Sequence, residues 1–186
     1  TNDYLVSVYL HSLQEIFNKQ NMLGKKTAGK ALRVLVPVNL RRLFPSKTMR
    51  NFSLYVIPGI DLNLGQYSFE EILKTVHHQM RLETDSKLIG KMLSRNVSGE
   101  LNPVIRGTPL LIKSMVLRRK YRSASRQYSG VLSNLGRTSF GPVLDPFIDH
   151  LVFFPPPPNK RLKVNCSVVT FEDKLLITFA NITRSR

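Results

Sequence analysis

The feature that most constrains the fold is a pair of apolar runs between residues 32 and 60, joined by a short basic connection. In the first run Val34, Val36 and Val38 alternate with other residues, and the second run, residues 52–58, is apolar on both sides of the alternation. Runs of this kind are typical of buried strands that helices cover on at least one face. The stretch therefore predicts two adjacent strands of one sheet.

Helical patterns flank this pair of strands. Residues 3–22 predict a helix, because its apolar residues share one face: Leu5, Tyr9, Leu13, Ile16 and Phe17. Ser68 and Glu71 have the spacing of a capping box, which starts a long helix predicted to continue toward Asn96. A further helical region begins near Pro103 or Pro109 and ends in the basic stretch 118–126.

From residue 130 onward the pattern is that of strands. Residues 131–135 predict a short strand that enters a turn at Gly136, and residues 150–154 predict another strand, ended by four prolines. Residues 162–171 and 175–181 predict a hairpin with one face open to water. Together the patterns predict an α/β fold, a two-layer α+β sandwich in which helices cover one face of a mixed β-sheet.

Length and cysteine content limit the remaining possibilities. A chain of 186 residues forms one domain, 1–186, with a core of its own. The single cysteine, Cys166, excludes an internal disulfide and is expected to be a small buried residue rather than a catalytic thiol. No apolar run approaches the roughly 18 residues of a membrane span. We therefore expect no membrane span, and a protein of the reducing cytoplasm.

Positive charge dominates the chain, with a formal net charge of +16. Residues 101–140 hold eight Lys and Arg residues and no Asp or Glu. Such a field favours a polyanionic partner, whether nucleic acid, an anionic membrane surface or a phosphate-bearing small molecule. The five cations of the stretch 118–126 either complement a helix dipole or form an anion site, and the basic loop 24–30 either approaches phosphates or is a solvated connector.

Two sets of polar residues are candidates for a site. Arg41 and Arg42 follow directly on a buried strand, at the edge of an open sheet where ligands tend to bind. His77 and His78 invite comparison with a His-His-x-x-x-Asp acyltransfer motif, but position 82 is Leu and the pair lies within an amphipathic helix. We expect His77 to border the core and His78 to face solvent.

Several segments, taken in order, resemble the C-terminal half of the chloramphenicol acetyltransferase-like, condensation-domain superfamily, in particular its alcohol acetyltransferase and wax-ester-synthase-like branches. The N-D-x-x-L segment of that family corresponds here to Asn2, Asp3 and Leu5-Val6, with Val6 at the position of the final leucine. Residues 36–41 match V-P-V-[DN]-L-R, and residues 133–136 match S-N-[LV]-G. The strand at NFSLYVIPGI and the closing hairpin extend the resemblance over essentially the whole chain.

The resemblance implies a two-lobed enzyme in which an acyl donor and an acceptor enter a tunnel between the lobes. The catalytic His-His-x-x-x-Asp of the family lies in the N-terminal lobe and has no match here, so this chain is expected to be the C-terminal lobe, inactive by itself. Its expected partners are that N-terminal lobe, a small alcohol or amine acceptor, and coenzyme A. The basic stretches 24–30 and 118–126 are expected to meet the phosphates of coenzyme A or of a carrier-bound phosphopantetheine. Arg41, Ser133, Asn134 and Gly136 are the residues expected to contact the acyl donor or substrate.

The implied reaction needs no permanently bound cofactor, since acetyl-CoA or another acyl-CoA acts as co-substrate. An alternative within the superfamily is a condensation or polyketide-associated lobe that takes its acyl group from a carrier protein. A basic nucleic-acid-binding domain is a further alternative of another class. It is disfavoured because the cations cluster in loops and helix ends without a known nucleic-acid-binding signature.

Overall fold

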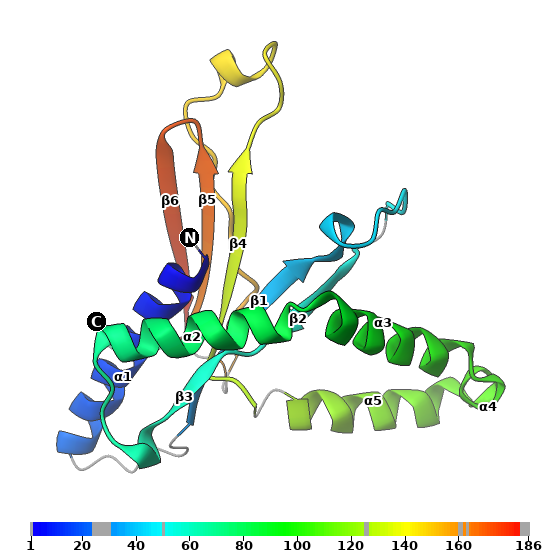
Figure 1. The fold of residues 1–186 in the computed structure, drawn as a ribbon. Coiled ribbons are helices and arrows are strands. Elements are labelled where there is room, and N and C mark those ends of the chain that lie inside the picture. The colour runs from blue at the N-terminus through cyan, green and yellow to red at the C-terminus, as the bar shows by residue number, and fades with distance from the viewer. Residues whose placement is uncertain are drawn as a thin grey trace.

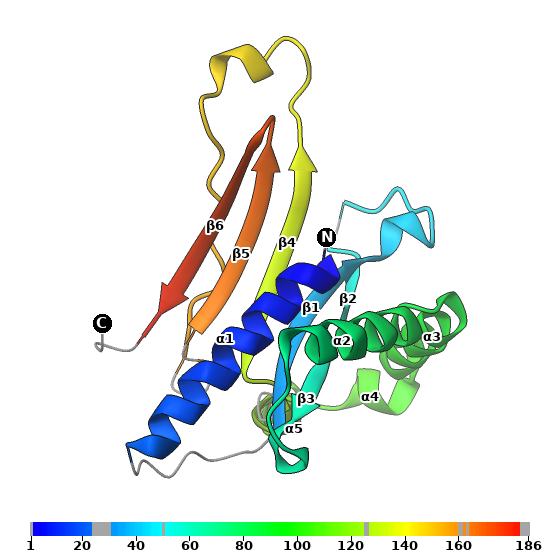
Figure 2. The ribbon, with the colours of Figure 1, turned by 60° about the vertical axis from the view of Figure 1, so that its left-hand side comes forward.

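A mixed, open sheet of six strands forms the centre of the chain in the computed structural model (Figure 1). The structure describes residues 2–23, 31–49, 51–124, 127–159, 162 and 164–182. The strand order is β2-β1-β4-β5-β6, and β3 also pairs with β1. With helices α1 and α2 on one face of this sheet (Figure 2), the α/β two-layer sandwich predicted from the sequence is confirmed.

The two apolar runs predicted as adjacent strands are adjacent. β1 (Ala31–Asn39) pairs antiparallel with β2 (Ser53–Val56) and with β3 (Gly59–Asp61). Val34 and Val36 of β1 are 0% and 1% exposed. Their burial follows from the alternation, which directs every second side chain toward the helices.

The second half of the sheet combines parallel and antiparallel pairs. β4 (Gly130–Thr138) runs parallel to β1 and to β5 (Val164–Phe171), and β6 (Lys174–Asn181) closes the sheet antiparallel to β5. The β1–β4 register extends only over Val34 with Gly130 and Leu35 with Val131. Beyond these pairs the two strands diverge, so the sheet opens into two arms (Figure 1).

Helix α1 (Asn2–Met22) lies across the sheet and is held there by polar contacts as well as by its apolar face. The Tyr9 ring packs on Gly130, and its hydroxyl donates to the carbonyl oxygen of Val164 at 3.0 Å. Burial raises the pKa of this phenol well above its usual range. Gln14 exchanges two hydrogen bonds with the backbone of Tyr67, at 2.8 and 3.2 Å.

The prediction of a strand at residues 150–154 is wrong. That segment has no regular structure and, with the prolines, lies over the face of β5 opposite the helices. Ser167 Oγ donates to the carbonyl of Phe153, and Asn165 Nδ2 donates to the carbonyl of Pro156 at 2.9 Å. The expectation that the hairpin has one wet face is therefore also wrong for β5, whose polar residues are buried under this covering segment.

The long helix predicted from Ser68 toward Asn96 is two helices. α2 (Phe69–Glu83) begins at the predicted capping box of Ser68 and Glu71, and α3 (Ser86–Leu101) follows after a break at Thr84. Asp85 caps α3 through bonds from the amides of Lys87 and Leu88, at 2.9 and 3.2 Å. This cap competes with continuation of α2, because an Asp side chain satisfies the first amides of a new helix.

Two further helices, α4 (Pro103–Gly107) and α5 (Leu110–Ala124), continue from α3 and lead back toward β4. In Figure 1, α3, α4 and α5 project from the sheet as an arm. We call residues 86–124 the helical arm.

We predict that Gly130→Ala destabilises the protein by about 1–3 kcal/mol, the usual cost of overpacking a filled core. A Cβ at this position would collide with the ring and hydroxyl of Tyr9. Urea denaturation measures the change, and Gly99→Ala is the matched control, since nothing lies within 4 Å of a Cβ there. A Gly130→Ala protein as stable as the wild type would show that α1 does not pack on β4 in this way.

Cys166 is buried in the core, as expected, and burial raises the pKa of its thiol to about 11. Because only the thiolate reacts, we predict that a disulfide reagent leaves the folded protein unlabelled near neutral pH and modifies it rapidly once urea unfolds the chain. Equal labelling rates in the folded and unfolded protein would contradict the burial of this strand.

Candidate functional site

The N-D-x-x-L and S-N-[LV]-G segments meet in the structure. Asn134 Nδ2, on β4, donates to Asn2 Oδ1, in the first turn of α1, at 2.6 Å. The same Asn134 side chain accepts through Oδ1 from the amide of Gly136 at 2.9 Å. Two segments separated by 132 positions in the chain are thus joined by a direct side-chain hydrogen bond.

Gly136 does not form the expected turn at the end of a strand. β4 continues to Thr138, and its register with β5 shifts between Asn134 and Arg137. Gly136 lies in this irregularity with a φ of 78°, a left-handed conformation that glycine adopts without strain. The sequence reasoning placed the conformational requirement at the correct residue but assigned it to a turn instead of a β-bulge.

Ser133 and Asn134 point to opposite faces of the sheet. In the register with β5, Ser133 lies beside Ser167 and Asn134 lies beside Val168. Val168 belongs to the core under the helices, whereas Ser167 faces the covering segment 151–158. Of the two neighbouring residues, Asn134 is therefore the one that lies on the helix face, beside the start of α1.

Arg41 lies at the end of β1, in the short 3-10 helix at Leu40–Arg42. Its amide donates to Asn39 Oδ1 at 3.0 Å, and its guanidinium donates to the carbonyl of Thr48 at 3.0 Å. The guanidinium thus bridges the connection that follows β1. β1 and β4 diverge beyond Leu35 and Val131 (Figure 1). Arg41 follows the end of β1, so this divergence separates it from β4.

A histidine–carboxylate pair lies next to the Asn2–Asn134 contact. His77 Nδ1, on α2, is 2.7 Å from Asp3 Oδ2, and the two side chains are 43% and 32% exposed. A carboxylate at one ring nitrogen fixes the orientation of the imidazole. His77 thus borders the core as expected, and His78 is exposed.

The first turn of α1 is therefore a polar junction of three elements. We call Asn2, Asp3, His77 and Asn134 the α1-start cluster: it joins α1 to β4 through the Asn2–Asn134 hydrogen bond and to α2 through the Asp3–His77 contact. Sequence reasoning missed the role of Asp3 toward His77, since 74 positions separate them and only the packing of α2 beside α1 brings them together.

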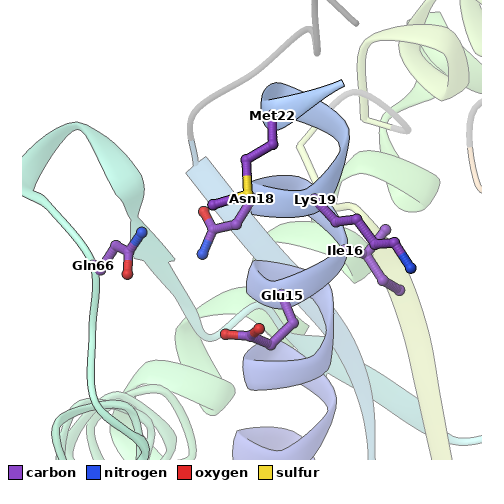
Figure 3. Close-up of a pocket in the computed structure, with 6 residues that line it drawn as sticks. All are labelled: Glu15, Ile16, Asn18, Lys19, Met22 and Gln66. Carbon is purple, nitrogen blue, oxygen red and sulfur yellow. The ribbon is translucent and has the colours of Figure 1, made fainter. Parts of the chain in front are cut away.

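The open hollows of the surface lie elsewhere. One, of about 380 Å³, lies at the other end of α1 and is lined by Glu15, Asn18, Lys19 and Gln66 among others (Figure 3). Its side chains extend in different directions around the helix and do not converge on one point (Figure 3). It offers no arrangement for catalysis.

A larger hollow, of about 610 Å³, lies between β3 and α2. Gln79 bonds both the amide and the carbonyl of Gly59, at 2.7 and 3.0 Å, and Glu83 accepts from the amide of Ile57 at 2.8 Å. These polar groups are engaged with the outer edge of the sheet. They protect that edge from pairing with another strand.

The described ranges contain no cluster of metal-ligating side chains and no helix that could span a membrane. No group of three or more His, Cys, Asp or Glu side chains there has the arrangement of a metal site. None of the helices in these ranges combines the length and the hydropathy needed to cross a bilayer.

Comparison with known proteins assigns no family. No protein-family model matches the sequence, and no curated protein matches it significantly.

The amide pair of the α1-start cluster makes a testable contribution to stability. We predict a coupling of about 0.5–1.5 kcal/mol between Asn2→Ala and Asn134→Ala in a double-mutant cycle, the usual net value of a hydrogen bond. Denaturation of the four proteins measures it. Additive effects of the two substitutions would show that β4 and α1 are not joined here.

Proposed function

We propose that this chain is the C-terminal lobe of an acyl-CoA-dependent O- or N-acyltransferase of the chloramphenicol acetyltransferase-like superfamily, closest to the alcohol acetyltransferases. The general-base histidine belongs, in this proposal, to an N-terminal lobe. The observation that carries the proposal is the 2.6 Å hydrogen bond between Asn134 and Asn2. This bond joins two of the short segments that carry the resemblance. Chance similarity of two short segments gives no reason to expect that they contact each other in the fold.

The chemistry of Asn134 supports the proposal. The Gly136 amide can donate only to the side-chain oxygen, so it fixes which way the Asn134 amide points. The NH₂ group then lies toward the start of α1, where one hydrogen is used by Asn2 Oδ1. The second hydrogen remains as a donor from a half-buried, oriented amide. A donor of this kind stabilises the oxyanion that develops when an alcohol or amine attacks a thioester carbonyl.

Assigning the general base to one lobe and the carbonyl hydrogen-bond donor to the other is chemically consistent. The N-terminal lobe would supply the base that deprotonates the acceptor, and this lobe would supply a donor to the carbonyl of acetyl-CoA or another acyl-CoA. Asn2 and the bulge at Gly136 act as positioning groups, because they hold the Asn134 amide without reaching the reacting atoms. Arg41 lies apart from this cluster and would act only on a more distant part of a substrate.

The basic stretches receive no support as contacts to the coenzyme A phosphates. Residues 118–122 lie on α5, in the helical arm that projects away from the sheet (Figure 1). The loop 24–30 and residues 125–126 lie outside the described residues.

In the two-lobed enzyme we predict that Asn134→Ala lowers kcat/KM for acyl transfer by roughly 10- to 1000-fold, the range for loss of one oxyanion donor. Release of free coenzyme A from acetyl-CoA with a panel of alcohols measures the rate. The chain 1–186 alone serves as the blank, since it is expected to have no turnover.

Asn102→Ala is the matched control, because it removes a helix cap in the helical arm, away from Asn134. It should leave acyl transfer close to the wild-type rate. An Asn134→Ala enzyme that is less stable but equally active would assign Asn134 a purely structural role and contradict the proposal.

A further inference from the structure

Among the residues that the structure describes, buried side chains of the helical arm lie only near its beginning. Ile89, in the first turn of α3, is 1% exposed, and Gly90 faces the ring of Phe44. Beyond residue 93, every described side chain of the arm is exposed or half-buried. The arm therefore presents most of α3 and all of α4 and α5 to its surroundings.

The far end of the arm is apolar. Leu110 and Leu111 are 79% and 83% exposed, and Met115 is 72% exposed. Leu101, Val104 and Ile105 add further exposed apolar side chains from the end of α3 and from α4. We call these six residues the apolar tip. Exposed apolar side chains grouped this closely along the chain indicate a site of interaction with a protein or a membrane.

Cations follow the apolar tip along α5. Arg118, Arg119 and Lys120 are exposed, and they begin seven residues after Leu111. At 1.5 Å per helical residue, Arg118 lies about 10 Å beyond Leu111 along the helix axis but only about 4–5 Å beyond Met115. Residues 101–140 contain no Asp or Glu that would neutralise them. Leu117 and Tyr121 are 61% and 62% exposed beside these cations, so exposed apolar groups continue into the basic part of α5.

Complementing the helix dipole explains only part of this arrangement. Cations at the C-terminal end of α5 are favourable for its dipole, as the sequence alone suggests. That explanation gives no reason for exposed leucines and a methionine in the first turns of the same helix, where solvation favours polar residues. A partner that offers an apolar layer bordered by negative charge would satisfy both kinds of exposed side chain.

We propose that the helical arm docks on an anionic lipid bilayer, with the apolar tip in the acyl-chain boundary and Arg118, Arg119 and Lys120 at the headgroups. Interfacial helices place apolar side chains in the acyl-chain boundary and cations at the headgroups of anionic lipids, and α5 exposes both kinds of side chain. Nucleic acid satisfies the cations but offers no apolar layer for the tip. The docking is peripheral, and it does not depend on the acyltransferase assignment.

Flotation with lipid vesicles tests the proposal on the chain 1–186. We expect the protein to bind vesicles of phosphatidylcholine with phosphatidylglycerol, and to bind phosphatidylcholine alone far more weakly. Replacing Arg118, Arg119 and Lys120 by Gln should weaken binding to the anionic vesicles by about 100-fold, from the usual contribution of each cation near such a surface. The matched control carries the same charge change elsewhere: Lys19→Gln, Lys74→Gln and Arg81→Gln. If the control loses as much affinity, attraction is due to net charge alone and the arm is not the docking site.

The apolar contribution has its own pair of variants. Replacing Leu110, Leu111 and Met115 by Gln should weaken vesicle binding at least about tenfold, since their buried apolar area drives insertion. The control replaces three exposed apolar residues outside the arm by Gln: Met49, Leu64 and Phe147. Undiminished binding of the tip variant would overturn the proposal, as would tighter binding of the wild type to duplex DNA than to the anionic vesicles.

A fluorescence measurement reports the position of the tip without removing any cation. Cys166 is buried, so a thiol-reactive, environment-sensitive dye labels Leu111→Cys selectively. We expect its emission to shift to the blue when anionic vesicles are added, and to stay unchanged with duplex DNA. An unchanged spectrum on bound vesicles would overturn the proposal. An emission already blue-shifted without lipid would also overturn it, because protein would then cover the tip.

Discussion

The seating of α1 on the sheet is the interaction on which the rest of the structure depends. Tyr9 lies on Gly130 and bonds the backbone of Val164, so one side chain fixes the helix against both β4 and β5. With the helix held at this point, its first turn reaches Asn134 on β4 and His77 on α2. The α1-start cluster is therefore a consequence of the same packing that closes the core, and the proposed acyl-transfer donor depends on it.

The two edges of the sheet differ in how far other parts of the chain cover them. At one edge, Gln79 and Glu83 of α2 occupy backbone groups next to β3, and this protects short strands from pairing with other chains. At the other edge, β6 pairs only with β5 among the described strands, and Leu175, Ile177 and Phe179 remain half-exposed or more. In a two-lobed enzyme such surfaces and the helical arm are the places where this lobe is free to meet other molecules.

Much of the fold was predictable because local patterns determine it. The alternation of Val34 and Val36 gave β1, and Ser68 with Glu71 gave the start of α2. The errors arose where tertiary contacts decide. The predicted apolar face of α1 included Ile16, but Ile16 is half-exposed and the polar residues Ser7 and Gln14 are buried instead. Gln14 can be buried because it hydrogen-bonds the distant backbone of Tyr67, a contact that no local pattern reveals.

The candidate site, like the fold, was only partly predictable from the sequence. Asn134 and Asn2 were recognisable from short motifs, but their contact depends on how α1 crosses β4, which no local pattern contains. Arg41 and Ser133 were grouped with Asn134 because they belong to similar strand ends or to the same motif. The divergence of β1 from β4 separates Arg41, and the pleat of β4 turns Ser133 to the other face.

The most direct test of the two-lobe account is the coding sequence that precedes Thr1. The account predicts an upstream domain in the same reading frame that carries a His-His-x-x-x-Asp motif, because it assigns the general base for the acceptor to an N-terminal lobe. An upstream sequence without that motif, or a reading frame with no upstream domain, would contradict the assignment of this chain as the C-terminal lobe of an acyltransferase.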